Sequence, residues 1–247
     1  MLSYILVNQP IALVTGANKG IGKEIARQLA AKDVFVLMAA RDRQRGEAAV
    51  RELQSQGLTV EFLHLDVTSQ PTIDSAAAEI ERKYGRLDIL VNNAGLALDW
   101  YPSSQLSFET LEQTFKTNVF GVYAVTTAML PLLKKSQHGR IVNLSSAVGS
   151  LARRSDPSAL PAIANMLLAY SSSKAALNMM TIQFANELKP FGIKVNAISP
   201  GPTATDMTQN RGTKTPEQGA AAPVKFALLP DDGPTGLFSS DEGNIPW

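Results

Sequence analysis

Short apolar runs alternate with segments of helical periodicity along most of the chain. The apolar runs cover residues 11–14, 34–40, 60–65, 87–91, 140–144 and 193–198, with residues 237–238 as a short last candidate. Runs of this length with few polar breaks are typical of strands that are covered on both faces of a sheet. Between them, apolar residues three or four positions apart predict a helix opening at Ile21 and further helices at about 43–56, 70–84, 107–116, 118–136 and 169–189.

The alternation predicts an α/β fold, with a single doubly wound parallel β-sheet and helices on both faces. Repeated strand–helix units give parallel strands joined by right-handed crossovers, and 247 residues suit one such domain, spanning 1–247. Two stretches break the pattern: an insertion at about 150–168, and the Pro-, Gly- and Thr-rich residues 200–235. Both follow the carboxyl ends of predicted strands, where open α/β sheets bind ligands. We therefore expect them to wall a pocket, with a substrate loop at about 202–225.

Composition excludes several classes of site and partner. The formal net charge is +1, from 23 Lys and Arg against 22 Asp and Glu, which gives no sign of a nucleic-acid or anionic-membrane partner. The chain has no cysteine and only two histidines, so disulfides, thiol catalysis, a serine–histidine triad and a metal centre are not expected. The first apolar stretch ends before Pro10, too early for a signal peptide or a membrane span. We expect a soluble, cytoplasmic protein.

A glycine cluster joins the first predicted strand to the first helix. Gly16, Gly20 and Gly22 follow the strand with the spacing G-x-x-x-G-x-G. Without a Cβ the backbone can approach a phosphate closely, and the free N–H groups and dipole of the helix favour negative charge. The same cluster could be only a tight turn with close helix packing, so the rest of the chain decides between the two.

The end of the second predicted strand bears on which dinucleotide would fit. An NAD site usually places an acidic residue there to accept from the ribose 2′-hydroxyl, whereas this chain has Arg41, with Arg45 four residues on and Lys19 in the glycine turn. Guanidinium groups suit a 2′-phosphate, which they grip with paired charged hydrogen bonds. The sequence therefore favours NADP(H) over NAD(H), although Asp42 leaves an acid within reach and the cations could simply face water.

Two further strand ends carry polar residues with two possible roles each. Asp66 could accept from an adenine amino group, or it could start the next helix as an N-cap or Asx-turn. Asn92-Asn93-Ala94-Gly95 would let the backbone pass close to a flat group, but a plain turn explains it almost as well. Neither feature identifies a ligand by itself.

A tyrosine and a lysine on one predicted helix are candidates for proton transfer. Tyr170 and Lys174 lie four positions apart and therefore share a face. A free tyrosine has a pKa of about 10, and a nearby ammonium together with an oxidised nicotinamide would lower it. In carbonyl reduction the phenol would donate its proton while hydride arrives from the cofactor. Such a pair alone is more often an exposed helix face, so its meaning depends on the motifs around it.

The motifs occur in the order found in the short-chain dehydrogenases/reductases, a family that this chain resembles from about residue 10 to 240. They are Thr15-Gly16-x-x-x-Gly20-Ile21-Gly22, Asp66-Val67, Asn92-Asn93-Ala94-Gly95, Asn118, Ser145-Ser146, Tyr170-x-x-x-Lys174 and Pro200-Gly201. The Asn18-Lys19 turn, Ala40-Arg41-Asp42 and Arg45 look most like the NADPH-dependent carbonyl reductases and the salutaridine-reductase-like enzymes. The resemblance implies a Rossmann-type fold and an NADP(H)-dependent oxidoreductase.

The resemblance also implies roles for single residues. Tyr170 would be the acid/base, Lys174 would tune it and hold the ribose, and Asn118 would hold the water of a proton relay. Ser146, the second serine of its pair, would orient the substrate oxygen, although Ser145 is also available. The cofactor would contact a set that spans the chain: Gly16, Asn18, Lys19, Gly20, Ile21, Gly22, Arg41, Arg45, Asp66, Val67, Asn93, Ala94, Gly95, Tyr170, Lys174, Pro200, Gly201, Thr203 and Thr205.

The insertion lies beside this expected active site. Ser146 and Tyr170 are 24 positions apart, about twice the spacing of most family members. In position the insertion resembles that of the monomeric carbonyl reductases, which favours a monomer and leaves a homo-oligomer as the alternative. We expect residues 166–168 to help form the pocket or its packed wall, with Trp100, Tyr101 and Met207 as further candidates.

The sequence thus predicts an NADPH-dependent reductase that converts a ketone or aldehyde to an alcohol, reversibly. Its partner would be a small carbonyl or alcohol substrate, with no metal, nucleic acid or membrane involved. Two alternatives stay open. One is an NAD-linked alcohol or steroid-type dehydrogenase that works oxidatively, and the other is an NADP(H)-binding sensor without useful turnover.

Overall fold

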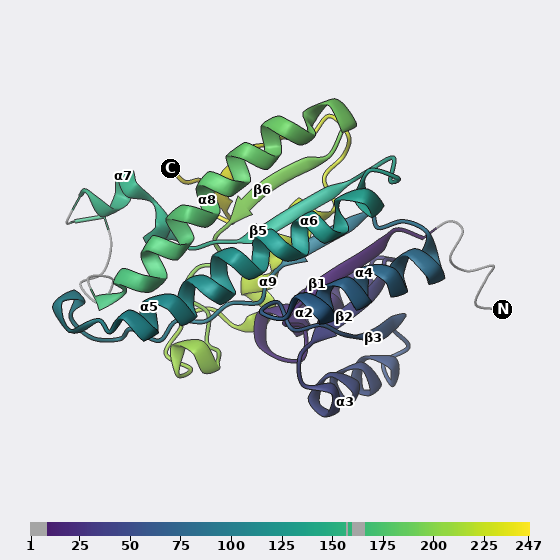
Figure 1. Cartoon of the computed structure of the whole chain (residues 1–247), viewed down its shortest axis with the longest axis horizontal. Coiled ribbons are helices and arrows are strands. Elements are labelled where there is room, and N and C mark those ends of the chain that lie inside the picture. Colours follow the sequence, from purple (N-terminus) through teal and green to yellow (C-terminus); the bar gives the residue numbers. More distant parts are fainter. Residues whose placement is uncertain (1–8, 157, 160–165) are drawn as a thin grey trace.

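The strands form one eight-stranded sheet, which lies behind a layer of helices in the view of Figure 1. The computed structural model describes residues 9–156, 158–159 and 166–247. The strand order is β3-β2-β1-β4-β5-β6-β7-β8, and the pairing is parallel except between β7 and β8. The predicted doubly wound parallel sheet is confirmed. The strands are β1 (Ile11–Thr15), β2 (Phe35–Ala40), β3 (Val60–His64), β4 (Ile89–Asn92), β5 (Arg140–Leu144), β6 (Lys194–Ile198), β7 (Phe238–Ser240) and β8 (Gly243–Asn244).

Helices cover both faces of the sheet. One face is covered by α2 (Gly20–Ala30), α3 (Arg43–Gln54) and α9 (Pro216–Ala227), and the other by α4 (Gln70–Tyr84), α6 (Val122–Leu133) and α8 (Leu168–Leu188), which form the front layer of Figure 1. β1 is buried along its whole length. Ala12 and Val14 pack into the first core, which lies between the sheet and α2, α3 and α9. Ile11 and Leu13 pack into the second core, which lies between the sheet and α4, α6 and α8. This is why the strand is apolar from Ile11 to Val14 instead of alternating.

Two helices predicted at 107–116 and 118–136 form one continuous helical path. It consists of α5 (Phe108–Phe115), a π-helical turn η2 (Lys116–Gly121) and α6, which contains Pro131 and ends at Leu133. The sequence therefore predicted the helical character correctly, but not the π-turn that joins the two segments. Such turns occur often at functional sites.

The stretch expected to be a substrate loop up to residue 225 contains a helix. α9 begins at Pro216, so the loop after β6 ends at Thr215 and the predicted boundary was wrong. Thr215 and Gln218 form a capping box: the Thr215 hydroxyl accepts from the Gln218 amide at 3.2 Å, and the Gln218 side chain accepts from the Thr215 amide at 2.9 Å. A Thr-Pro-x-Gln start is a sequence signal for a helix, and it outweighs the Pro and Gly content of the stretch.

Candidate active site

The residues that the sequence singled out lie at one edge of the sheet. They occupy the connections that follow the carboxyl ends of β1 to β6, together with the first half of α8. β1 and β4 are neighbours in the sheet, and the strand order reverses between them. Open α/β sheets bind ligands at this switch point. None of the described residues lies in a His, Asp or Glu cluster that could hold a metal ion.

The glycine turn between β1 and α2 has the geometry of a phosphate cradle. Gly16 and Gly20 have left-handed φ angles of 64° and 56°, which residues with a Cβ rarely adopt. Asn93, beyond β4, donates through Nδ2 to the carbonyl oxygens of Thr15 at 2.8 Å and Gly16 at 3.2 Å, and it leaves no room for a Cβ at Gly22. The Lys19 side chain makes no cap to the start of α2, so this helix end fits an anionic group of a cofactor.

The three predicted 2′-phosphate ligands are all exposed. Arg41 follows β2, and Arg45 lies in the first turn of α3. Asp42, the acid that stayed within reach in the sequence, is engaged locally, because its Oδ1 accepts from the Arg45 amide at 3.0 Å and so caps α3. Lys19 pairs with Asp206 of the loop after β6, with 2.5 Å between Nζ and Oδ2.

Asp66 has the local role that the sequence left open. Its Oδ1 accepts from the amide and the hydroxyl of Thr68 at 2.9 and 2.8 Å, which forms an Asx-turn. The N-cap of the following helix α4 is Ser69. Val67, next along the chain, packs partly buried into the second core. No contact of Asp66 in the structure bears on adenine recognition.

The two adjacent serines after β5 point to different partners. Ser145 is buried and donates its hydroxyl to Asn178 Oδ1 on α8 at 2.6 Å. Ser146 forms a side-chain hydrogen bond with Tyr170. The structure therefore brings Ser146 to the phenol and ties Ser145 into the packing of α8 against the sheet.

Burial dominates the titration of the tyrosine and the lysine. It raises the pKa of Tyr170 to about 12, while the hydrogen bond from Ser146 acts in the opposite direction. Burial lowers the pKa of Lys174 from 10.5 to about 8. The sequence predicts that the lysine and an oxidised nicotinamide together lower the pKa of the tyrosine. In the protein alone the pKa shift has the opposite sign, because desolvation disfavours the phenolate. The phenol therefore keeps its proton near neutral pH.

Lys174 and Asn118 lie close to Gly95, three residues after the end of β4. Lys174 Nζ donates to the carbonyl oxygen of Leu144 at 2.7 Å and lies 5.5 Å from the centre of the Tyr170 ring. A Cβ at Gly95 would come within 3.3 Å of Asn118 Oδ1 and 3.7 Å of Lys174 Nζ. The 3.7 Å separation is an ordinary contact, whereas the 3.3 Å separation is tight enough that a side chain at Gly95 would require a small shift of Asn118.

Asn118, in the π-turn η2, bonds in three directions to the protein. Its Oδ1 accepts from the Leu96 amide at 2.9 Å, and its Nδ2 donates to the Leu96 carbonyl at 2.8 Å and to Ser173 Oγ at 3.0 Å. The carboxamide thus fixes the segment after β4 against α8.

The loop after β6 packs onto the glycine turn. Pro200 and Gly201 lead into buried Thr203 and half-buried Thr205. A Cβ at Gly20 would lie 3.4 Å from the Thr205 methyl carbon. The segment predicted to contact the nicotinamide therefore lies beside the segment predicted to hold the phosphates.

The insertion is only partly described. It begins with the short helix α7 (Leu151–Arg154), and residues 157 and 160–165 lie outside the described residues. Of the three predicted wall residues, Leu167 is buried, whereas Met166 and Leu168 are exposed. Gly149, just before α7, packs directly on Lys174, where a Cβ would meet the lysine at 2.7 Å.

Two residues beside this site were missed in the sequence. Asp99 is buried after β4 and accepts through Oδ2 from the Ala169 amide at 2.6 Å. Trp247 stacks on Phe238 with 5.5 Å between ring centres, and its carbonyl oxygen accepts from the Ala152 amide of α7 at 3.0 Å. No local pattern marks either residue, because both act on segments distant in the sequence.

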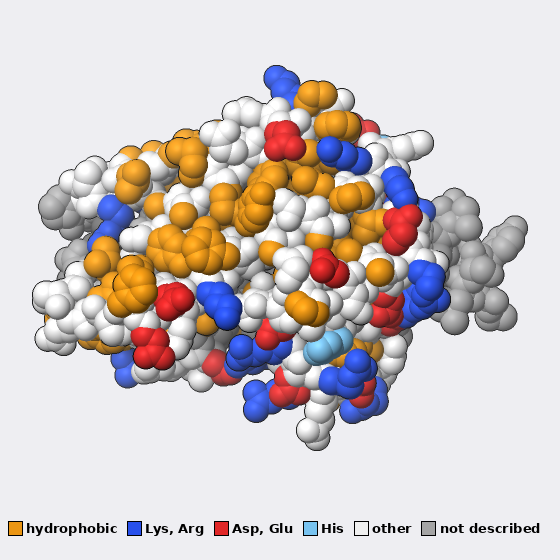
Figure 2. Space-filling model, viewed as in Figure 1, with side chains coloured by type: hydrophobic (Ala, Val, Ile, Leu, Met, Phe, Trp, Pro, Cys, Tyr) orange, Lys and Arg blue, Asp and Glu red, His pale blue; other side chains and the backbone are white. Residues whose placement is uncertain are grey.

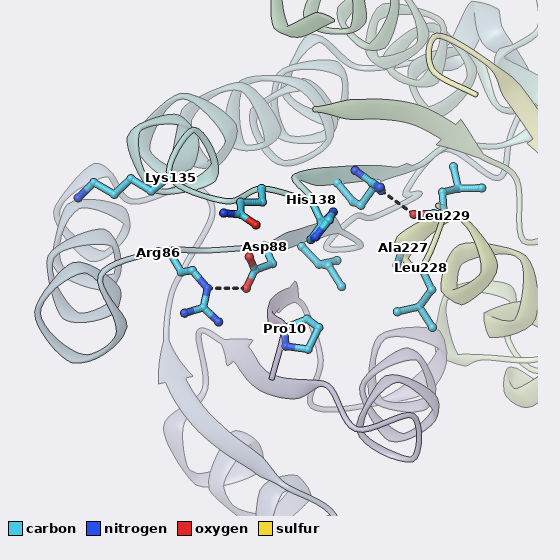
Figure 3. Close-up of a pocket in the computed structure, with 11 residues that line it drawn as sticks. Pro10, Arg86, Asp88, Lys135, His138, Ala227, Leu228 and Leu229 are labelled. Atoms are coloured by element: carbon cyan, nitrogen blue, oxygen red, sulfur yellow. Dashed lines mark hydrogen bonds and ion pairs between the residues drawn. The ribbon is translucent and has the colours of Figure 1, made fainter. Parts of the chain in front are cut away.

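A cavity of about 500 Å³ lies at the opposite edge of the sheet (Figure 3). Its wall includes Pro10 before β1, Asp88 before β4 and Arg140 at the start of β5. Its charged groups are satisfied by one another and by neighbours. Asp88 pairs with Arg86 at 3.1 Å, and Arg140 with Asp231 at 2.8 Å. The cavity contains none of the predicted site residues, so the chemistry belongs to the other edge.

Sequence and structure comparisons agree on the relatives of this chain. The profile of the short chain dehydrogenases matches residues 10–216. Short-chain dehydrogenase/reductase 1 of Saponaria officinalis is 35% identical over an alignment of 299 positions, which covers 99% of this chain and 98% of the relative. Carbonyl reductase (NADPH) 1 of Mus musculus is 36% identical over 97% of this chain and 99% of the relative.

Solved structures show the same architecture. Salutaridine reductase from Papaver somniferum superposes with a TM-score of 0.82 at 34% identity, covering 93% of this chain and 99% of that one. The NADPH-bound carbonyl reductase from chicken fatty liver gives 0.85 at 28% identity, covering 98% and 100%.

The matched profile spans most of the chain, and the relatives align over nearly their full length at identities well above chance. The sheet order and the ordered motifs at its carboxyl edge agree with them. The predicted resemblance is therefore confirmed: the chain belongs to the short-chain dehydrogenase/reductase family of oxidoreductases.

Proposed function

We propose that the protein is an NADPH-dependent reductase that converts a ketone or aldehyde to an alcohol. The observation that carries this proposal is the group formed by Ser146, Tyr170 and Lys174. In it Ser146 is hydrogen-bonded to the phenol, which keeps its proton near neutral pH, and the Nζ of the buried Lys174 lies 5.5 Å from the centre of the phenol ring. A protonated donor is what the reductive direction needs, whereas the oxidative direction needs the phenolate.

Each residue of the group has a distinct task in this reaction. Ser146 donates a hydrogen bond to the carbonyl oxygen and holds it beside Tyr170. As the carbonyl carbon is reduced, negative charge develops on that oxygen, and the Tyr170 hydroxyl donates its proton there. Lys174, when protonated, stabilises the phenolate that remains. Asn118 holds the backbone of Leu96 against α8 and would hold a relay water from there.

The cofactor preference rests on the exposed cations around the glycine turn. The turn would hold the pyrophosphate, and Arg41, Arg45 and Lys19 would hold a 2′-phosphate. When bound, the nicotinamide supplies the hydride. Thr203 and Thr205, beside the turn, would bind the carboxamide. The engagement of Asp42 as the cap of α3 supports NADPH over NADH, because its Oδ1 is used by the Arg45 amide.

The substrate side of the site is partly apolar. Residues 96–105, 147–156 and 203–215 follow β4, β5 and β6 and therefore lie at the same sheet edge. They expose Leu98 and Met207, whose exposed fractions are 42% and 36%. This composition fits a carbonyl compound with a hydrophobic body.

The test is a screen of aliphatic and aromatic ketones and aldehydes with NADPH, in which the loss of NADPH absorbance measures turnover. Tyr170→Phe should lower kcat by at least about 100-fold, the usual scale for a lost general acid, while NADPH binding by fluorescence stays unchanged. Arg41→Asp should reverse the cofactor preference. A Tyr170→Phe variant with full turnover would refute the mechanism.

Two other outcomes would favour the alternatives. Faster turnover with NADH, unaffected by Arg41→Asp, would indicate an NAD-linked dehydrogenase. Tight NADPH binding without turnover on any carbonyl compound would indicate a sensor.

A further inference from the structure

Tyr170 stands in the first turn of α8, where a helix is least firmly held. The helix begins at Leu168, its N-cap residue Leu167 makes no side-chain cap, and its first turn has no acidic residue. The first four N–H groups of a helix have no partner inside the helix, and uncapped ends fray. A proton donor in this turn therefore needs an anchor from another part of the chain.

Asp99 supplies this anchor from 70 positions away. Its Oδ2 accepts from the Ala169 amide at 2.6 Å, and the Tyr170 amide lies 3.4 Å from the same oxygen. A carboxylate at this point also interacts favourably with the positive end of the helix dipole. The cap that the local sequence lacks is therefore provided by the connection after β4.

The connection that carries Asp99 is itself fixed to the active-site helices. Leu96, three residues earlier, bonds to Asn118 through both its amide and its carbonyl. Asn118 in turn donates to Ser173, between Tyr170 and Lys174 on α8. Asp99 thus completes a second link between the segment beside the substrate pocket and the helix of the proton donor.

Packing alone does not explain a carboxylate at this position. Asp99 is 1% exposed, and its Oδ1 finds no hydrogen-bond donor among the described residues. Burial raises the pKa of the Asp99 carboxyl, against the lowering effect of the backbone amides. A buried polar atom left without a partner destabilises a fold. An apolar residue would avoid this cost, but it could not hold the amides of the first turn.

We propose that Asp99 is a positioning residue for the reaction: it holds the first turn of α8 so that the Tyr170 hydroxyl stays aligned with Ser146 and the substrate oxygen. The inference rests on the proposed function, because it assigns the effect of Asp99 to the role of Tyr170 as proton donor. It concerns the turnover step and not the binding of the cofactor.

The experiment compares two substitutions with a matched control. Asp99→Ala removes both contacts, and Asp99→Asn keeps an oxygen that can accept from the Ala169 amide. The control is Asp88→Ala. Asp88 is also buried and accepts from a distant backbone amide, that of Ile11 at 2.8 Å, but it lies at the opposite edge of the sheet (Figure 3).

Asp99→Ala should lower kcat by about 10- to 100-fold, the scale of a misplaced reacting group. NADPH affinity, measured by fluorescence without substrate, should change by less than about threefold, since Tyr170 is only one of many expected cofactor contacts and the glycine turn is unchanged. Amide exchange at residues 169 and 170 should accelerate. Asp99→Asn should restore kcat to within about fivefold of the wild type, and Asp88→Ala should lower Tm while keeping kcat.

Three results would overturn the inference: full kcat in Asp99→Ala, an equal fall of kcat in Asp88→Ala, or no recovery in Asp99→Asn. If the alanine variant does not fold, Asp99→Ser leaves less empty volume and carries the same expectation. Tyr170→Phe distinguishes a failure of the proposed function from a failure of the role assigned to Asp99. Full turnover in that variant refutes the proposed function, whereas an inactive Tyr170→Phe beside a fully active Asp99→Ala refutes only the role of Asp99.

Discussion

Lys174 is a buried cation, so its proposed catalytic role would come at a cost to the stability of the fold. Its Nζ has the Leu144 carbonyl as acceptor, and no carboxylate among the described residues pairs with it. We expect Lys174→Met to raise the free energy of unfolding at pH 7 by about 1–3 kcal/mol, because a buried charge without a counter-ion is replaced by an apolar chain of similar length. The same variant should lose at least about 100-fold in kcat.

The gain should depend on pH in a defined window. The pKa of Lys174 is about 8 in the folded protein and 10.5 as the ordinary value, so between these limits the unfolded chain binds more protons and wild-type stability rises with pH. The advantage of Lys174→Met should therefore be full below pH 8 and disappear towards pH 10.5. Urea unfolding at pH 7 and pH 10 measures it. An advantage that is equal at both pH values would contradict the burial argument.

Asp206 lies where it would compete with the 2′-phosphate of the proposed NADPH for Lys19. The two side chains pair at 2.5 Å, and the hydrogen bond from Lys19, with a smaller contribution from the charge of Arg45, lowers the pKa of the Asp206 carboxyl. Asp206→Asn should free Lys19 for the 2′-phosphate. We expect NADPH to bind about two- to fivefold more tightly, the scale of an exposed ion pair, and NADH affinity to stay unchanged.

Fluorescence titration with both dinucleotides measures the effect of Asp206→Asn. Asp241→Asn is the control, because Asp241 forms a similar pair with Lys214 at 2.6 Å. Unchanged or weaker NADPH binding in Asp206→Asn would mean that the carboxylate does not compete with the phosphate.

At the level of single residues, the sequence predicted which side chains come together better than it predicted their surroundings. The ordered motifs identified Ser146, Tyr170 and Lys174 as a group, and the structure brings them together. The sign of the Tyr170 pKa shift in the protein alone could not be predicted, because it depends on burial, which spacing does not encode. Asp99 gave no signal in the sequence because its partner amide is 70 positions away along the chain.

The helices and strands were predictable where the chain carries a clear run or a helical repeat of apolar residues. Strands β1 to β6 each appear as one apolar run, and their pairing follows from the rules for repeated strand–helix units. The two-residue strand β8 is too short to have a period, and it exists because it pairs with β7. Helix α9 was missed because Gly219 and Pro223 argue against a helix, whereas the capping box at Thr215 and packing against α2 stabilise one.

The tail after β8 fastens the short helix α7 beside the active site. Trp247 stacks on Phe238, and Ser150, the N-cap of α7, donates its hydroxyl to the Pro246 carbonyl at 2.6 Å. We expect Trp247→Ala to lower the free energy of unfolding by about 1–2 kcal/mol through the lost stacking and burial. KM for the carbonyl substrate should rise several-fold, because α7 is held less firmly, while NADPH affinity is unchanged.

Steady-state kinetics on a carbonyl substrate tests the role of the tail. Phe191→Ala is the control, since Phe191 is an exposed aromatic residue that contacts Lys134 away from α7. A Trp247→Ala variant that loses stability but keeps its KM would show that the tail supports the fold alone.

At the scale of the whole molecule, two features bear on the oligomeric state and disagree. The position of the insertion favours a monomer by resemblance. However, α5, η2, α6 and α8 expose apolar side chains on one face, where Figure 2 shows hydrophobic groups gathered. Phe108, Phe120, Tyr123 and Met179 are 78%, 59%, 55% and 56% exposed. None of the described part of the insertion covers them, and clustered exposed apolar side chains usually mark a protein interface.

We expect the exposed face to outweigh the resemblance, because it is a property of this chain's own surface. Light scattering after size exclusion at micromolar concentration should then give about twice the 26.5 kDa of one chain. In a two-fold dimer each substitution acts on both subunits, so Phe120→Glu should shift the mass towards the monomer without changing the fold. Leu151→Glu on α7 is the control, with a similarly exposed apolar side chain. A wild-type mass of one chain would instead support the monomer that the insertion indicates.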